Sequence, residues 1–247
     1  MSAPFLKPAV SEALQRANVF ELFAHAFAHP DTGRVTVLRD AARAVLQGDC
    51  PLPILRLAVL ARETDRNSLE PVYVSLTTLS SSPDCPSYES AYFGGEPQAQ
   101  TQRMADIAGF YRAFGVDATE GGYRPDDLSV ELDFMAFLCR KQAYAEDHLG
   151  APRAGQARKA QRLFLGEHIG RWAPVFAESF ASRAPAGHFY AVAGETMAWW
   201  LDQEFRKAGI MPEIVTGPVL GGISPASHGP EFAGDAAFIP VESLTGG

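Results

Sequence analysis

The sequence predicts an all-α fold, a single-domain helical bundle, and three observations support this prediction. Apolar residues recur at intervals of three and four along most of the chain, which is typical of the buried side of a helix. Prolines and glycines stand between these periodic segments, where helices begin and end. The alternating pattern of β-strands is scarce. The 247 residues, 47% of them hydrophobic, can bury one sizeable core.

Four helices are expected in the first third of the chain, and most of them have a start or stop signal. Their ranges are residues 11–28, 35–46, 52–63 and 69–79. Pro30 follows the first helix, Gly48 follows the second and Pro51 precedes the third, as is typical of helix ends. The fourth contains β-branched side chains that suit a helix or a strand. We interpret it as a helix because its neighbours are helical.

The rest of the chain predicts five more helices. They are expected at residues 98–114, from Asp126 or Asp127 onwards, and at 157–172, 174–184 and 186–208, with turns or loops at 80–86, 88–96 and 117–125. Asp126 or Asp127 can cap the first backbone amides of its helix. Apolar residues such as Leu132 and Met135 crowd that helix, so we expect it to be central and largely buried. A break is expected at Pro174.

The composition changes after Lys207. Residues 209–247 contain 8 Gly and 5 Pro but no Lys or Arg. This composition predicts an irregular or disordered tail behind a helical domain of residues 1–208. Apolar residues such as Ile214 and Val215 would allow parts of the tail to dock on the domain.

Charge and cysteine content limit the partners and the compartment. The net charge of −8 argues against a nucleic-acid partner, because phosphates need a basic surface. Cys50, Cys85 and Cys139 are far apart and form no CxxC motif, which favours a reducing compartment. The N-terminus lacks the pattern of a signal peptide, and no stretch approaches the roughly 18 apolar residues of a membrane span. We therefore expect a cytoplasmic protein without membrane insertion.

Motifs for catalysis and for cofactor binding are missing from the sequence. It contains no GxxxxGK[ST] phosphate loop, no GxGxxG after a strand and no GxSxG nucleophile motif. His25 and His29 have the spacing of two metal ligands on one helix face, but no Cys/His cluster completes such a site. Cys139 lies on an apolar helix face, as a core residue does. We expect a protein that is not an enzyme and that holds no metal or cofactor.

Acidic residues are grouped at the start of the expected central helix. Asp126 and Asp127 are also favoured there by the helix dipole, which is a purely structural explanation. Glu131 is different, because its helical neighbours are mostly apolar and a carboxylate among them needs a partner or water. Arg124, Arg171 or an arginine of a ligand are the candidate partners.

Aromatic residues form a second candidate group. Tyr88, Tyr92 and Phe93 crowd one loop, and aromatic rings with polar tips suit contact with a peptide. His168, Trp172 and Phe176 share one helix face at a spacing of four. Packing over the core is the alternative explanation for both groups.

Three segments together resemble a known family. Residues 88–92 read Tyr-Glu-Ser-Ala-Tyr and resemble the family's Tyr-x-Ser-x-Tyr region. Residues 125–135 resemble its Pro-Asp-His-Leu-x-x-Glu-Leu-Glu-Phe-Met block, and residues 164–176 resemble its Phe-x-x-x-His-Leu-x-x-Trp-x-Pro-x-Phe block. These are features of the TorD/DmsD/NarJ family of redox-enzyme maturation chaperones, and the resemblance spans about residues 10–208.

The resemblance implies a TorD-like helical bundle and a chaperone. Family members bind the apo catalytic subunits of molybdopterin-dependent oxidoreductases, recognise their twin-arginine signal peptide or N-terminal region, delay export and assist cofactor insertion. We expect a client of the dimethyl sulfoxide reductase type and a chaperone that is a monomer or a homodimer. Asp127 stands where the family often has histidine, which adds negative charge beside a site for basic peptides.

A twin-arginine leader offers two guanidiniums followed by an apolar run, so its receptor should place carboxylates beside an apolar groove. The expected peptide-binding residues are Tyr88, Glu89, Tyr92, Asp126, Asp127, Leu128, Glu131, His168 and Trp172.

Two other interpretations remain open. The chain could be a delta-type accessory subunit retained in a nitrate-reductase-like complex. It could also be a small hydrolase that uses Asp126, Asp127 or His168. Some relatives are said to bind guanine nucleotides, but this sequence contains no phosphate loop for catalysis on one.

Overall fold

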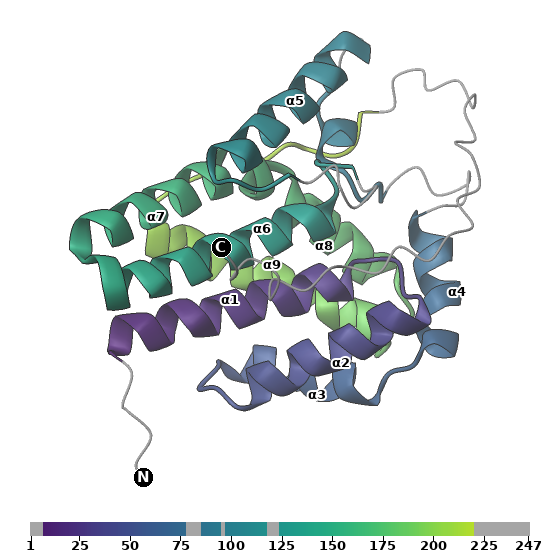
Figure 1. The fold of residues 1–247 in the computed structure, drawn as a ribbon. Coiled ribbons are helices and arrows are strands. Elements are labelled where there is room, and N and C mark those ends of the chain that lie inside the picture. Colours follow the sequence, from purple (N-terminus) through teal and green to yellow (C-terminus); the bar gives the residue numbers. More distant parts are fainter. Residues whose placement is uncertain (1–6, 78–84, 95–96, 118–123, 220–247) are drawn as a thin grey trace.

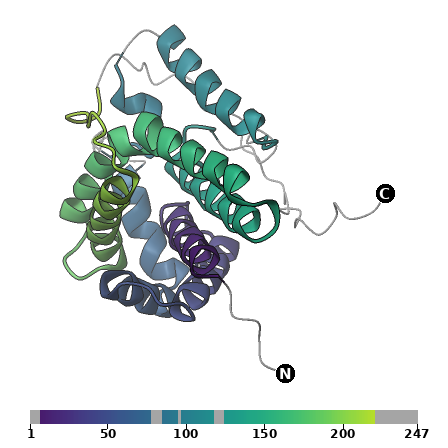
Figure 2. The same ribbon diagram turned by 90° about the vertical axis from the view of Figure 1, so that its left-hand side faces the viewer.

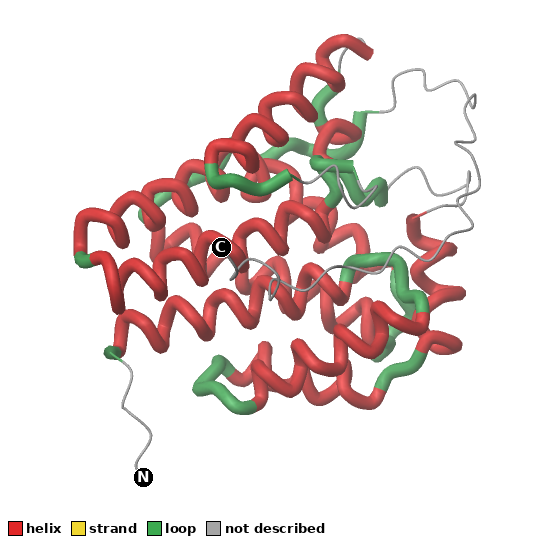
Figure 3. The backbone as a smooth tube through the Cα atoms, in the orientation of Figure 1, coloured by secondary structure: helices red, strands yellow, loops and turns green. Residues whose placement is uncertain are grey.

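The computed structural model describes residues 7–77, 85–94, 97–117 and 124–219. Within these ranges the chain forms helices and loops, and β-type pairing is limited to an isolated bridge between Tyr88 and Asp127. Figure 3 shows this distribution along the backbone. The predicted all-α fold is confirmed. The turns expected at 80–84, 95–96 and 118–123 and the tail at 220–247 lie outside the described residues.

Nine α-helices make up most of the described chain. They are α1 (Pro8–Ala26), α2 (Thr32–Leu46), α3 (Leu52–Glu63), α4 (Arg66–Thr77), α5 (Pro97–Ala113), α6 (Leu128–Tyr144), α7 (Ala151–Phe164), α8 (Gly170–Arg183) and α9 (Phe189–Ala208), with a 3₁₀ turn η1 (Glu89–Tyr92) before α5. The third helix has its predicted bounds, and the β-branched segment of α4 is helical as interpreted. None of the helices in the described ranges is long and apolar enough to span a membrane.

The first helix lies at the centre of the bundle. Figure 1 shows α1 side by side with α6, and Figure 2 shows it nearly end-on, between α6 and α7 on one side and α8 and α9 on the other. The two central helices are antiparallel, since the Lys7 Nζ before α1 donates to the Glu146 carbonyl beyond the end of α6 at 3.2 Å. Consecutive positions of α1 are buried, so its apolar surface is wider than one stripe.

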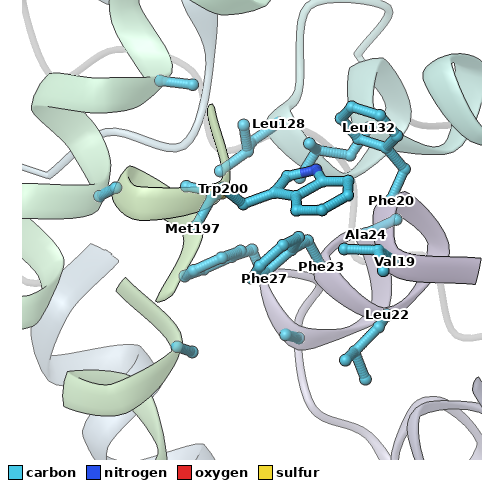
Figure 4. Packing of buried hydrophobic residues seen from close by; sticks show 14 of the residues in the cluster. Val19, Phe20, Leu22, Phe23, Ala24, Phe27, Leu128, Leu132, Met197 and Trp200 are labelled. Carbon is cyan, nitrogen blue, oxygen red and sulfur yellow. The ribbon is translucent and has the colours of Figure 1, made fainter. Parts of the chain in front are cut away.

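Aromatic side chains of α1 fill the centre of the core. Phe20, Phe23 and Phe27 are all 0% exposed. Figure 4 shows them packed with Leu128 and Leu132 of α6 and with residues of α9. Because each buried phenylalanine contributes about 3 kcal/mol or more, this cluster stabilises the contact between the N-terminal helices and the helices that carry the candidate site.

The central helix α6 begins as the sequence predicts. The Asp127 side chain accepts a hydrogen bond from the Ser129 backbone N–H at 2.9 Å and so caps the first turn. Leu132, Met135 and Cys139 of this helix are buried. The predicted N-cap and the predicted burial of α6 are therefore confirmed.

The break expected at Pro174 is wrong. Pro174 lies inside α8, and the interruption falls earlier, at a π-helical turn that spans Leu165–Ile169 between α7 and α8. A wide turn of this kind already disrupts the regular hydrogen-bond ladder. Pro174 therefore lies after the π-helical turn, in a helix whose hydrogen bonding is already interrupted upstream. Reading the proline as the break placed the interruption too late in the sequence.

A buried ion pair joins the first and the last helix. The Arg16 side chain of α1 is 12% exposed and pairs with Glu204 of α9, which is 3% exposed. Its Nη1 also donates to the Gln161 Oε1 of α7 at 2.8 Å. A buried charge needs such partners, so this group of side chains holds three helices in one arrangement.

The segment after α9 lies on the body of the protein. Gly209 has a φ of 61° and ends the helix in the left-handed conformation that favours glycine. Residues 210–219 contain neither helix nor strand, and the Val215 backbone N–H donates to the Arg171 carbonyl at 2.9 Å. This described part of the predicted irregular tail is irregular, and it packs on the helices through Ile210 and Val215.

Helices α8 and α9 cross closely at a glycine. A Cβ atom added at Gly194 of α9 would lie 2.6 Å from the Ala177 carbonyl oxygen and 2.9 Å from the Ala181 Cβ of α8. Both distances are below van der Waals contact, and one neighbour is rigid backbone.

Gly194→Ala should therefore lower the free energy of unfolding by about 1–3 kcal/mol, because the helices must move apart. Gly109→Ala on α5 is the matched control, since its nearest neighbour would be the mobile Arg112 Nη2 at 3.8 Å. The control should gain up to about 1 kcal/mol from helix propensity. Urea titrations of both variants test this, and equal stability of the two would refute the close crossing.

Candidate functional site

A short segment before α5 pairs with the chain just before α6. The Leu128 N–H donates to the Ser87 carbonyl at 2.8 Å, and the Glu89 N–H donates to the Asp126 carbonyl at 2.8 Å. Residues 87–89 and 126–128 thus run antiparallel. This pairing brings two of the three motifs that resemble the family together at the N-terminus of the central helix.

Asp126 is buried and fully partnered. Its side chain is 0% exposed and accepts from Arg124 Nε at 3.0 Å and from the Ser90 backbone N–H at 3.1 Å. The Arg124 guanidinium also donates to Ser90 Oγ at 2.9 Å and lies over the Tyr88 ring, 4.3 Å from its centroid. One internal arginine therefore covers the carboxylate that was expected to receive an arginine of a peptide.

Asp127 is half-buried, and its side chain stabilises the start of α6. Besides capping α6, it accepts a hydrogen bond from Ser87 Oγ at 3.2 Å. Burial raises the pKa of Asp127, although the hydrogen bonds from Ser129 and Ser87 oppose that shift. The position where the family often has histidine is here a structural cap.

Glu89 connects η1 with two other elements. It is 0% exposed, and its Oε1 accepts from Arg103 Nη1 of α5 at 2.6 Å. Its Oε2 lies 3.2 Å from His168 Nδ1 in the π-helical turn after α7. The third family-like motif therefore meets the first one at this carboxylate.

Glu131 lies beside Glu89 in the interior. It is 0% exposed, and its Oε2 accepts from the Trp172 indole Nε1 at 3.3 Å. Burial and the neighbouring Glu89 carboxylate raise the pKa of Glu131 well above its usual range. Two carboxyl groups this close cannot both be charged at low cost, so this arrangement favours the protonated form of Glu131. Neither Arg124 nor Arg171, the partners suggested by the sequence, pairs with Glu131.

Three arginines form the outer layer of the site. The side chains of Arg103 and Arg171 are each 26% exposed, and that of Arg124 is 46% exposed. Arg103 and Arg171 both approach the Phe93 ring, at 3.6 and 4.7 Å from its centroid. The carboxylates thus point inward and the guanidiniums outward, which reverses the arrangement expected from the sequence. Phe93 belongs to the aromatic loop identified from the sequence, whereas Arg103 was not predicted as a site residue, because no local spacing pairs α5 with that loop.

All nine predicted peptide-binding residues lie in this region, but with different access to solvent. Tyr88, Asp127 and His168 are half-buried. The buried members are Glu89, Tyr92, Asp126, Leu128, Glu131 and Trp172. Tyr92 and Trp172 pack against each other with ring centroids 5.0 Å apart and planes tilted by 38°. The cluster is therefore a closed polar centre with an accessible rim.

The carboxyl pair of this cluster is closed off from solvent, since Glu89 and Glu131 are both 0% exposed. Within the described residues, no group of three His, Cys, Asp or Glu side chains lies close enough to hold a metal ion. Glu89 and Glu131 line neither of two surface clefts, one at residues 162–171 and 209–213 and one between α1, α7 and the end of α9. A substrate would therefore need an opening at this carboxyl pair before acid–base chemistry could reach it.

Glu131→Gln should change how stability depends on pH. In wild type, the folded state takes up a proton above the ordinary pKa of glutamate, so the free energy of unfolding falls as pH rises through the raised pKa. The amide of the glutamine does not titrate in this range, so the variant lacks this contribution to the pH dependence of stability. Between about pH 5 and pH 8 the wild type should lose at least about 1 kcal/mol more than the variant.

Urea titrations at both pH values measure the difference, with the exposed Glu178→Gln as the matched control. Parallel pH profiles for wild type and Glu131→Gln would show that Glu131 is ionised in the folded protein.

Comparisons with known proteins agree with the sequence motifs. A family model described as nitrate reductase delta subunit matches residues 43–178. A perchlorate reductase assembly chaperone protein from Dechloromonas aromatica is 35% identical over 107 residues, which cover 42% of this chain and 47% of that protein. The chaperone protein TorD of Vibrio cholerae is 28% identical over 138 residues, which cover 56% of this chain and 54% of that protein. The chain thus spans about half the length of these curated relatives.

A solved structure has the same fold. A protein described as a redox enzyme maturation protein from Archaeoglobus fulgidus aligns with a TM-score of 0.51 and 19% identity, over 81% of this chain and 98% of that one. At this identity the likeness concerns the fold alone. The family model covers more than half of the sequence, from before the end of α2 into α8. The chain therefore belongs to the nitrate reductase delta subunit family, which is the TorD/DmsD/NarJ family that its three motifs resemble.

Proposed function

We propose that this protein is an assembly chaperone for the catalytic subunit of a molybdopterin-dependent oxidoreductase. It binds the apo subunit through a twin-arginine leader or the N-terminal region, assists cofactor insertion and delays export. The client is of the dimethyl sulfoxide reductase type. The chaperone acts in the cytoplasm, as a monomer or a homodimer.

One observation carries the proposal. The three segments that resemble the family motifs are far apart in the sequence, yet they meet at Glu89. Its carboxyl group lies beside that of Glu131 and contacts His168, and its backbone N–H donates to the Asp126 carbonyl. Two relatives with assembly or chaperone names are similar to parts of this chain. A helical bundle could be stable without such a costly buried cluster, so a role in recognition is the better explanation.

The inward carboxylates determine how a leader would bind. A client arginine can reach Asp126 only when Arg124 moves away, because Arg124 already covers that carboxylate. The exchange replaces one guanidinium by another and leaves the buried charge paired. Tyr88, which stacks on Arg124, would then stack on the incoming guanidinium. Recognition in this scheme is an exchange of arginines at the rim.

Capture from the source cell tests the function itself. The full-length protein should retain an apo molybdoenzyme subunit that still carries its leader, and it should release the subunit that contains cofactor. Mass spectrometry of the retained proteins identifies the client. Failure to retain any molybdoenzyme subunit or any twin-arginine leader would disprove the proposal.

Arg124→Ala should make the protein more responsive to a twin-arginine peptide. The variant leaves the Asp126 carboxylate uncovered, so its melting temperature should fall, and the peptide should restore several degrees more than it adds to wild type. A peptide with two lysines should restore less, because an ammonium group cannot pair bidentately.

Arg112→Ala on the exposed side of α5 is the control for loss of an arginine. Differential scanning fluorimetry measures all three proteins. Equal peptide-induced shifts for Arg124→Ala and Arg112→Ala would place leader binding away from Asp126.

A second candidate function follows from the description of the family. A delta-type accessory subunit would stay in a nitrate-reductase-like complex, whereas a chaperone leaves it. Purification of the mature holoenzyme distinguishes the two, since only an accessory subunit would co-purify in stoichiometric amount.

A further inference from the structure

The chain between α9 and Val219 crosses the surface next to the candidate site. We call residues 210–219 the strap. From the end of α9 it passes over the start of α8 and reaches η1, where the Val219 N–H donates to the Ala91 carbonyl at 2.9 Å. In Figure 1 the yellow-green end of the described chain follows this path towards the short turn before α5. Ala91 belongs to the same short segment as Tyr88 and Glu89.

Glycines on the body form the seat of the strap. A Cβ added at Gly94 would lie 2.7 Å from Val219 Cγ1, and a Cβ at Gly170 would lie 2.8 Å from Pro212 Cγ. At Gly94 no larger residue fits without movement of the strap. At Gly170 a Cβ would also clash with the Leu165 carbonyl oxygen of the body, so this glycine serves the body as well as the strap. The groove is therefore shaped to receive an extended backbone with apolar side chains.

The strap is held loosely in this seat. Met211 is 98% exposed, and Ile214 and Val219 are 47% and 53% exposed. The ion pair of Arg171 with Glu213 is 3.7 Å long, and the Glu213 side chain is 92% exposed, so it contributes little. A cleft remains between the strap and the turn after α7, lined by Leu163, Gly166, Met211 and Pro212. The strap thus covers the groove without filling it.

We propose that this groove binds an extended apolar peptide segment of the client and that the strap occupies it in the free protein. The strap itself shows what the groove accepts: ten residues without Lys or Arg, whose backbone N–H groups reach the carbonyls of Arg171 and Ala91. The inference rests on the proposed function, because the guest is the apolar run that follows the arginines of a leader. A peptide whose arginine reached the rim at Tyr88 could continue along this groove.

Competition follows from this arrangement. The strap is tethered, so its effective concentration at its own seat is high. The apparent affinity for a guest peptide is then the intrinsic affinity multiplied by the fraction of time that the seat is free. Fixing the strap should weaken binding of a leader, and loosening it should strengthen binding.

A reversible crosslink fixes the strap in the full-length protein. The Gly94→Cys/Val219→Cys variant places two sulfur-bearing positions together, since a Cβ at Gly94 lies 3.2 Å from the Val219 Cβ, close to disulfide geometry. The native Cys50, Cys85 and Cys139 are buried and far less accessible to oxidants. The probe is a fluorescent synthetic peptide with two arginines followed by a Leu/Ala stretch, and anisotropy gives its Kd.

The oxidised variant should bind this peptide about 10-fold more weakly than the same protein after reduction. Equal affinity of the two forms, with clear binding by both, would overturn the inference and leave the proposed function intact. Absence of binding by wild type and by the reduced variant would overturn the proposed function and this inference together.

Val219→Asp loosens the strap by a single substitution and should tighten binding about threefold or more. Leu149→Asp is the matched control, because Leu149 is also 53% exposed and precedes the start of α7, whereas the cleft lies at the end of that helix. Equal affinities for the two variants would contradict the proposal. A concentration-dependent dimer formed by Val219→Asp alone would make a second copy the occupant and would also contradict it.

Discussion

The antiparallel pairing of residues 87–89 with residues 126–128 is the contact on which the candidate site depends. It brings the carboxylates of Glu89 and Asp126 under the N-terminus of α6, away from water. Buried carboxylates need partners, so Arg103 of α5 and Arg124 must approach the same segment. A few backbone hydrogen bonds thereby determine where α5 lies and which residues form the rim. The π-helical turn after α7 completes the centre through His168.

In this arrangement the contacts that would give affinity for a partner differ from those that would give specificity. If an incoming arginine replaces Arg124, the number of ion pairs is unchanged, so the exchange itself contributes little net free energy. Specificity would come from shape instead, because the Asp126 carboxylate and the Tyr88 ring together fit a planar guanidinium. Affinity must then come from apolar contacts along the neighbouring groove. Weak, replaceable contacts would suit the proposed chaperone role, in which the client is released once it is complete.

The sequence predicts the helices well and the site only in part. Periodicity and stop signals identify α3 to the residue, and the Asp127 cap follows from local chemistry. The interruption between α7 and α8 was predicted at Pro174 instead of at Leu165–Ile169, because a π-helical turn has no sequence marker as clear as proline. Family-like motifs identified the residues of the cluster, but local spacing could not show that Glu131 contacts Trp172 or that Glu89 contacts His168. The members of these pairs are 41 and 79 positions apart and meet only through the packing of distant elements.

The ion pair of Arg16 with Glu204 has a consequence for how the protein folds during its synthesis. The two residues are 188 positions apart, and Gln161 joins them from α7. On the ribosome, α1 emerges first, and its buried arginine has no carboxylate partner until α9 has been made. An unpaired charge in the core costs several kcal/mol, so the N-terminal half cannot settle into its final packing early. The bundle can therefore close around Arg16 only after α9 has been made.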